Sequence, residues 1–236
     1  MVFPDTFFLD LLKALIGSFA GAAAAFYINW HMRQSQREDD QVAAGNLAIM
    51  VLGRMINAFL IYKQGVLEDK KHVMEKMPNL PLWMQMRPIL HEFDESLAID
   101  MQSLTFLVRP HSVDAMNHIL IAQGKYRNLV YLQKQHFKDA QELQRILSEL
   151  QGDNQNGSIN LDIAEKKVPA YLSARIESTT AALHQALIED EAEMIGALQA
   201  LEKTLASTLV KNQIVRITLP KHLISAESKD QNRKDS

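Results

Sequence analysis

The stretch FFLDLLKALIGSFAGAAAAFYINW, residues 7–30, decides how this chain is built. Its only charges are Asp10 and Lys13, and residues 14–28 form an uninterrupted run of apolar side chains, glycine and serine. As a helix, these 24 residues extend about 36 Å at 1.5 Å each, enough to cross the hydrocarbon core of a bilayer. We therefore expect residues 1–30 to form an N-terminal transmembrane anchor.

A cleaved signal peptide is the main alternative, because the alanines at 22–25 resemble a small-residue cleavage site. Signal peptides begin with a basic region, whereas here no basic residue precedes Lys13, so the sequence favours a retained anchor. Arg33 and Arg37 follow the span directly. By the positive-inside rule they predict a single-pass protein of the bacterial inner membrane, with its N-terminus outside and its C-terminal domain in the cytoplasm.

One side of the predicted span combines small residues with its two charges. At 100° per residue the following positions fall along one face: Asp10, Lys13, Ala14, Gly17, Gly21, Ala24 and Ile28. The spacing of Gly17 and Gly21 lets two helix backbones approach closely in lipid, so this face predicts self-association or a membrane-protein partner. An alanine-rich span also contains this spacing by chance, and the two charges can reach the headgroup layer instead of pairing.

Composition narrows the remaining possibilities. The 236 residues include nine Gly and seven Pro, a low share that favours long helices and an all-α fold. With 25 Lys and Arg against 28 Asp and Glu, and no long basic block, the chain is a poor candidate for nucleic-acid binding. The absence of Cys excludes disulfides, thiol catalysis and cysteine-ligated metal sites.

The periodicity of apolar residues predicts an N-terminal transmembrane helix followed by a long-helix antiparallel bundle or helical hairpin. One rod is expected to run from near Asp5 to about Lys76, through a polar stretch without Pro or Gly. The cytoplasmic bundle spans residues 31–211, and the tail at 212–236 is predicted to be largely disordered. The helices of the bundle are expected at residues 31–76, 88–109, 112–151 and 161–211. The last of them begins later if Pro169 occupies its first turn.

Two segments leave alternatives open. Residues 47–62 are apolar enough to suggest a second span, but Arg54 at their centre and their short length favour a buried core helix. Residues 214–219 read as one short strand, whose pairing partner the sequence does not identify.

No constellation of residues points firmly to chemistry. His91, Asp94 and Glu95 could supply metal ligands, but no recognised motif completes a site. His118 and His136 lie five helical turns apart, about 27 Å, and cannot share an ion. The acidic cluster at residues 189–193 is typical of an exposed helix surface, although Asp190 falls near the apolar seam. Glycine-rich phosphate loops and a nucleophile elbow are missing, so we predict no catalytic residue, metal, cofactor or small-molecule substrate.

The chain resembles a loose group of uncharacterised bacterial inner-membrane proteins, through residues 15–30, AAGNLA at 43–48, FD at 93–94 and SLTFL at 103–107. The resemblance covers roughly the first half, implies a membrane span with an all-helical cytoplasmic body, and implies no activity. The leading hypothesis is thus a membrane-anchored, non-enzymatic scaffold or interaction protein, which associates with itself or joins a larger membrane complex. A sensor that transmits a signal through a continuous helix is the alternative, and a helical metal-dependent enzyme is the third.

Overall fold

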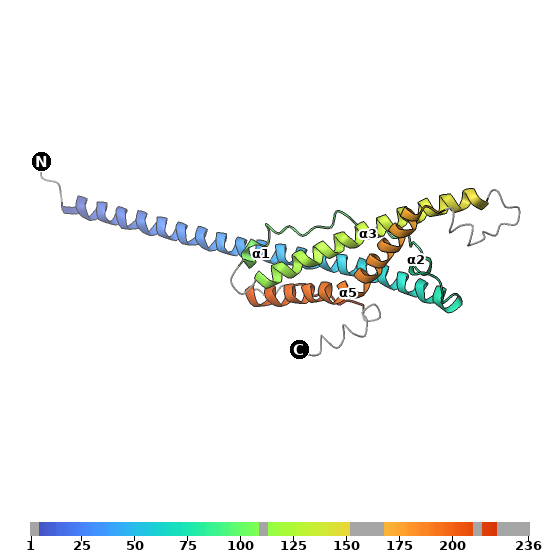
Figure 1. The fold of residues 1–236 in the computed structure, drawn as a ribbon. Coiled ribbons are helices and arrows are strands. Elements are labelled where there is room, and N and C mark those ends of the chain that lie inside the picture. The colour runs from blue at the N-terminus through green and yellow to red at the C-terminus, as the bar shows by residue number, and fades with distance from the viewer. Residues whose placement is uncertain (1–4, 109–112, 152–167, 210–213, 221–236) are drawn as a thin grey trace.

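The fold is described from a computed structural model, which describes residues 5–108, 113–151, 168–209 and 214–220. In these residues helices are the only regular elements, apart from turns and extended segments, which agrees with the predicted all-α class, and the short strand suggested for residues 214–219 does not form. The elements are α1 (Asp5–Lys76), α2 (Leu82–Gln85), the short 3-10 helix η1 (Thr105–Leu107), α3 (Val113–Gln151) and α5 (Ala170–Thr208) (Figure 1).

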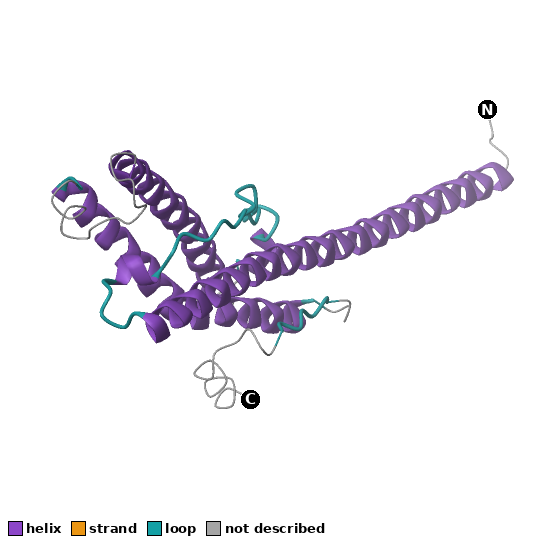
Figure 2. Ribbon diagram, turned by 90° about the vertical axis from the view of Figure 1, so that its right-hand side faces the viewer, coloured by secondary structure: helices purple, strands orange, loops and turns teal. Residues whose placement is uncertain are grey.

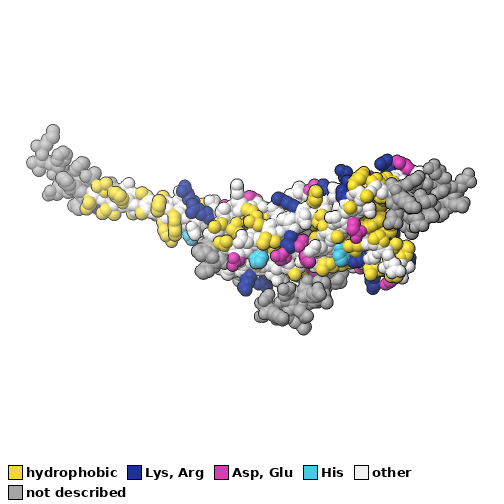
Figure 3. Space-filling view, viewed as in Figure 1, with side chains coloured by type: hydrophobic (Ala, Val, Ile, Leu, Met, Phe, Trp, Pro, Cys, Tyr) yellow, Lys and Arg dark blue, Asp and Glu magenta, His cyan; other side chains and the backbone are white. Residues whose placement is uncertain are grey.

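Helix α1 is a single rod of 72 residues, which confirms the continuous helix predicted from near Asp5 to about Lys76. Its N-terminal half projects beyond every other helix (Figure 1 and Figure 2), and in the space-filling view it carries apolar side chains along its length (Figure 3). Val42 is the first buried side chain of α1 in the described part. From there to Val73 the helix contributes one wall of the core.

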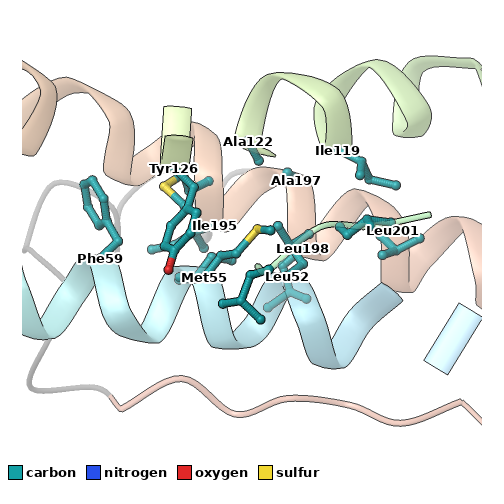
Figure 4. Close-up of a cluster of buried hydrophobic side chains, with 14 of the residues drawn as sticks. Leu52, Met55, Phe59, Ile119, Ala122, Tyr126, Ile195, Ala197, Leu198 and Leu201 are labelled. Atoms are coloured by element: carbon teal, nitrogen blue, oxygen red, sulfur yellow. The ribbon is translucent and has the colours of Figure 1, made fainter. Parts of the chain in front are cut away.

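The core lies where α1, α3 and α5 meet. Leu52, Met55 and Phe59 of α1 face Ile119, Ala122 and Tyr126 of α3 and Ile195, Ala197, Leu198 and Leu201 of α5 (Figure 4). Each of these side chains is at most 4% exposed. Burial of this kind stabilises a folded chain by about 25 cal/mol for each Å² of apolar surface removed from water. This packing, rather than local propensity, holds the three helices together.

The directions of the helices follow from their contacts. Helices α3 and α5 are antiparallel, since Lys125 bonds to Asp190 while Asp139, further along α3, bonds to Arg175, earlier in α5. Helix α1 is antiparallel to α5 and therefore runs parallel to α3, as Figure 1 also shows. Helix α5 is thus antiparallel to both α3 and α1.

Parallel α1 and α3 require a connection that returns along the length of the body, and residues 86–108, here called the strap, provide it. The predicted helix at 88–109 is wrong, because the strap is extended apart from turns and η1. Polar side chains in the strap bond to nearby backbone amides, Asp94 to Ser96 at 3.1 Å and Asp100 to Gln102 at 2.9 Å. Such local bonds compete with a helix.

The apolar residues whose spacing suggested a helix are used differently in the strap. Leu97 and Leu104 are buried in the main core, together with their neighbours Ile99 and Leu107, whereas Leu90 and Val108 are exposed. The amide of Ile99 donates to Oε1 of Gln123 on α3 at 2.9 Å, which also fixes the path of the strap. Apolar residues three and four positions apart therefore do not mark a helix here. They belong to an irregular segment that buries some of its side chains between turns.

The other predicted helices are shifted slightly. Helix α3 begins at Val113, and its expected start at 112 lies outside the described residues. Helix α5 begins at Ala170 with Pro169 as its N-cap, as the proline alternative proposed. The expected start at 161, up to 167, lies outside the described part, and the helix ends at Thr208 rather than 211.

Residues 214–220, here called the C-terminal segment, lie against the body, within a tail that the sequence predicted to be largely disordered. They form no strand. Instead, the amide of Val215 donates to Oδ1 of Asn46 at 2.9 Å and the amide of Ile217 donates to Oε1 of Glu202 at 3.1 Å. Side chains of α1 and α5 thus replace the partner strand. The predicted disorder at 221–236 lies outside the described residues.

Candidate functional site

The exposed half of α1 is the first candidate site. Every described side chain from Leu12 to Gln34 is exposed, including Phe19 and Phe26 at 75% each. The apolar part from Leu12 to Trp30 is roughly 28 Å long as a helix, close to the thickness of a bilayer core. Soluble monomers rarely leave so long an apolar surface in water.

Helix α1 is the one helix of the described residues that is long and apolar enough to cross a membrane. Two apolar stretches lie within it, and burial separates them. In residues 47–62 the side chains of Ile49, Leu52, Met55 and Ile56 have no exposed surface, since they lie in the core. This packing favours the core interpretation of residues 47–62 over a second span. Arg54 points outward, with 65% of its side chain exposed, and bonds to Asp94 of the strap.

The inner end of the apolar stretch carries aromatic and then basic residues. The ring of Tyr27 lies 6.3 Å from that of Trp30 and stacks on His31 at 6.4 Å. Arg33 and Arg37 follow within two turns, both exposed. Aromatic rings at the headgroup level, with basic residues beyond them, are typical of the boundary of a membrane span.

The predicted packing face of small residues is open where the structure describes it. A Cβ placed on Gly17 or on Gly21 would meet nothing within 4 Å, and Ala24 is exposed. Lys13 lies on the same face and is exposed. The side chains of Asp10 and Ala14, the other predicted members, lie outside the described part.

The small face overlaps the body side of α1 only at its edge. An α-helix repeats its azimuth every 18 residues, so Gly17 is in phase with Gly53, where a Cβ would collide with Cδ1 of Ile217 in the C-terminal segment. Gly21 is in phase with Asn57, which is exposed, whereas the fully buried Leu52 and Met55 are in phase with residues outside the small face. The small face is therefore turned away from most of the core side of α1.

The acidic cluster at residues 189–193 is divided among ion pairs. Glu191 bonds to Lys63 of α1, while Asp190 and Glu193 both bond to Lys125 of α3. Burial opposes the charge on Lys125, but its hydrogen bonds to the two carboxylates outweigh burial and raise its pKa. Glu191, with 2% of its side chain exposed, is more buried than Asp190. The cluster joins three helices through Asp190, Glu191 and Glu193, while Glu189 and Glu193 remain on the exposed helix surface.

A second polar cluster was not found from the sequence. Asp139 of α3 has no exposed surface and accepts from Nε of Arg175 at 2.9 Å, from Nε2 of Gln135 at 2.8 Å and from Oγ1 of Thr179 at 3.4 Å. Arg175 also donates to Oε2 of Glu142 at 2.6 Å. The arginine fork and the extra donors compensate the buried carboxylate. The only sequence signal was an acidic residue at an apolar-phase position of α3.

The residues considered for a metal site are not brought together. Asp94 bonds to Arg54 and Ser96, Glu95 pairs with Lys134, and His91 packs with Phe93 at 4.5 Å between ring centroids. Burial lowers the pKa of His91. Within the described residues, no group of three or more His, Asp or Glu side chains is arranged to hold an ion.

Comparison with known proteins adds no relative. No family model, no curated protein and no solved structure matches the chain. The arguments for function therefore come from its own residues.

Proposed function

We infer that the protein is a single-pass membrane protein whose helical body serves as a non-enzymatic scaffold or interaction module. One observation carries this proposal: the exposed apolar half of α1 is continuous with the helix that forms a wall of the core. In water the exposed side chains of Phe19, Phe26 and their neighbours are unfavourable, whereas in the hydrocarbon core of a bilayer they are in an apolar environment. The body at residues 42–209 is then a water-soluble unit fixed to the bilayer by one helix.

The charges after the apolar stretch support a particular orientation. Arg33 and Arg37 favour a cytoplasmic body, an outer N-terminus and the bacterial inner membrane. A reporter that is active only in the periplasm tests it: fused before Met1 it should be active, and fused after Ser236 it should be inactive.

Association through the small face is the proposed means of assembly, with a second copy or the helix of a membrane-protein partner. Gly17 and Gly21 leave room for a close helix contact.

A membrane two-hybrid assay tests this means of assembly. The double substitution Gly17→Leu and Gly21→Leu should abolish the signal. The control, Ala22→Leu with Ala23→Leu, adds the same side chains on the opposite face and should leave it intact. An unchanged signal in the glycine variant would remove the small face from the proposal.

A membrane sensor or regulator is the second candidate, favoured by the unbroken course of α1 from Asp5 to Lys76. A rigid helix can carry a displacement at the membrane to the core. Inserting Gly-Pro between Arg37 and Asp40 separates the two functions, because proline and glycine interrupt the rod. A scaffold should retain its partners in affinity capture, whereas a transmitter should lose its response.

A further inference from the structure

A groove of about 500 Å³ lies at the end of the body distant from the membrane, between the segment around α2 and the outer surfaces of α3 and α5. Its walls are mainly apolar: Trp83, Met84, Phe137, Leu143, Leu147 and Ile176. Figure 3 shows apolar side chains gathered over this end of the body. Volume and lining are both in the range of sites that bind small organic molecules.

The polar groups of the groove combine one cation with neutral groups. They are Arg87, His136 and two glutamines, Gln141 and Gln144, and no carboxylate is among the described residues that line it. His136 is 3% exposed, so its imidazole is a nearly buried part of the wall. The groove therefore presents one permanent positive charge, together with neutral groups that can both donate and accept hydrogen bonds, against apolar walls.

Arg87 is held in place without being fully used. Its Nε donates to Oδ2 of Asp69 at 3.1 Å and its Nη2 donates to Oδ1 of the same carboxylate, whereas Nη1 takes no part in this pair. The guanidinium, oriented by Asp69, can donate through Nη1 to one further anionic oxygen. Since Asp69 already balances most of its charge, a singly charged anion fits better than a phosphate ester with two charges.

We propose that this groove binds an apolar monocarboxylate, such as a medium-chain fatty acid or an aryl-alkanoic acid. The apolar part lies against Trp83, Phe137 and Leu147, and the carboxylate faces Arg87 and His136. An organic cation of the same shape is excluded, because it would meet arginine and histidine with no lining carboxylate to balance it. The binding site is independent of the membrane anchor.

The test uses the full chain in nanodiscs of zwitterionic phosphatidylcholine, with Trp30→Phe so that Trp83 becomes the only tryptophan. Octanoate, octan-1-ol and octylammonium are titrated at pH 7.5 while the emission of Trp83 is followed, and empty nanodiscs correct for partition into lipid. Octanoate should give a saturable change, with an affinity at least tenfold above that of octan-1-ol, and octylammonium should give none.

Variants then locate the carboxylate. Arg87→Gln changes an exposed side chain and should weaken octanoate binding at least fivefold, while Arg127→Gln, an exposed arginine of α3 away from the groove, should leave it unchanged. Equal binding of octanoate and octan-1-ol, binding of octylammonium, no saturable change at all, or an Arg87→Gln variant with full affinity would each overturn the proposal.

Discussion

Nζ of Lys63 on α1 donates a hydrogen bond to Oε2 of Glu191 on α5, and both side chains are buried. Two charges in the interior are tolerated only while each compensates the other. We therefore predict that Lys63→Met or Glu191→Gln alone lowers the free energy of unfolding by about 3–5 kcal/mol. Chemical denaturation of the purified chain, followed by circular dichroism, measures this.

The double variant Lys63→Met with Glu191→Leu should recover most of the stability, because it leaves no buried charge unpaired. Removing the exposed pair between Lys134 and Glu95 by Lys134→Ala should change the free energy of unfolding by about 1 kcal/mol at most. If the single and double variants are equally unstable, then the ion pair is not the reason for the loss.

Gly53 provides the space in which the C-terminal segment lies, because any side chain there meets Ile217. In the native chain the amides of Val215 and Ile217 donate hydrogen bonds to Asn46 and Glu202. We predict that Gly53→Leu displaces residues 214–220 from α1 and increases hydrogen exchange at these two amides. Gly124→Ala is the control, since a Cβ there meets nothing within 4 Å, and it should stabilise α3 by up to about 1 kcal/mol. Unchanged exchange in Gly53→Leu would contradict the placement of the segment.

Phe93 joins the strap to the body through its ring contacts. Its centroid lies 5.2 Å from that of Tyr62 on α1 and 5.8 Å from that of Tyr126 on α3. We predict that Phe93→Ala costs about 2–3 kcal/mol, less than for a fully buried ring, and loosens the strap. Limited proteolysis should then cut within residues 86–108 faster than in the wild type. Equal cleavage rates would show that the strap does not depend on this ring.

Three histidines make the body sensitive to acid. Burial lowers the pKa of His91, His136 and His184 below the ordinary value of 6.5, with Lys70 adding to the effect at His184. Well above pH 6.5 these side chains are neutral in both the folded and the unfolded state. Below it the unfolded chain takes up protons that the folded chain does not, so the free energy of unfolding falls as the pH decreases.

The melting temperature of the full chain in nanodiscs should accordingly be several degrees lower at pH 5.5 than at pH 7.5. The interval lies above the range where carboxylates titrate. His136→Gln should flatten this dependence, whatever its effect on stability at pH 7.5. A melting temperature that rises on acidification would contradict the assignment.

The sequence was sufficient for the long helices, because periodic apolar residues and few glycines or prolines are local signals. Helix α1 was predicted from end to end, and α5 with Pro169 at its start. The strap was not predicted. Its residues could form either a helix or the turns seen at Asp94 and Asp100, and packing against the rest of the body, which the sequence does not reveal, decides between them.

The same reason explains the polar sites. Asp190 was marked as unusual, but Glu191 is the more buried of the two, because α1 packs at that position with Lys63. Asp139 gave almost no signal alone, since its partners Arg175 and Thr179 come from another helix. Helical periodicity places residues on a face but leaves open which faces meet.

The central claim is that the exposed apolar half of α1 lies in the membrane and is retained. It is tested most directly by fractionating cells that express the full chain, washing the membranes with alkaline carbonate and measuring the intact mass of the protein in each fraction. We predict that the chain stays in the washed membranes with residues 7–30 present, and that deletion of residues 1–34 moves it to the supernatant. A full chain found in the supernatant, or a mature form that begins after Ala25, would contradict the account.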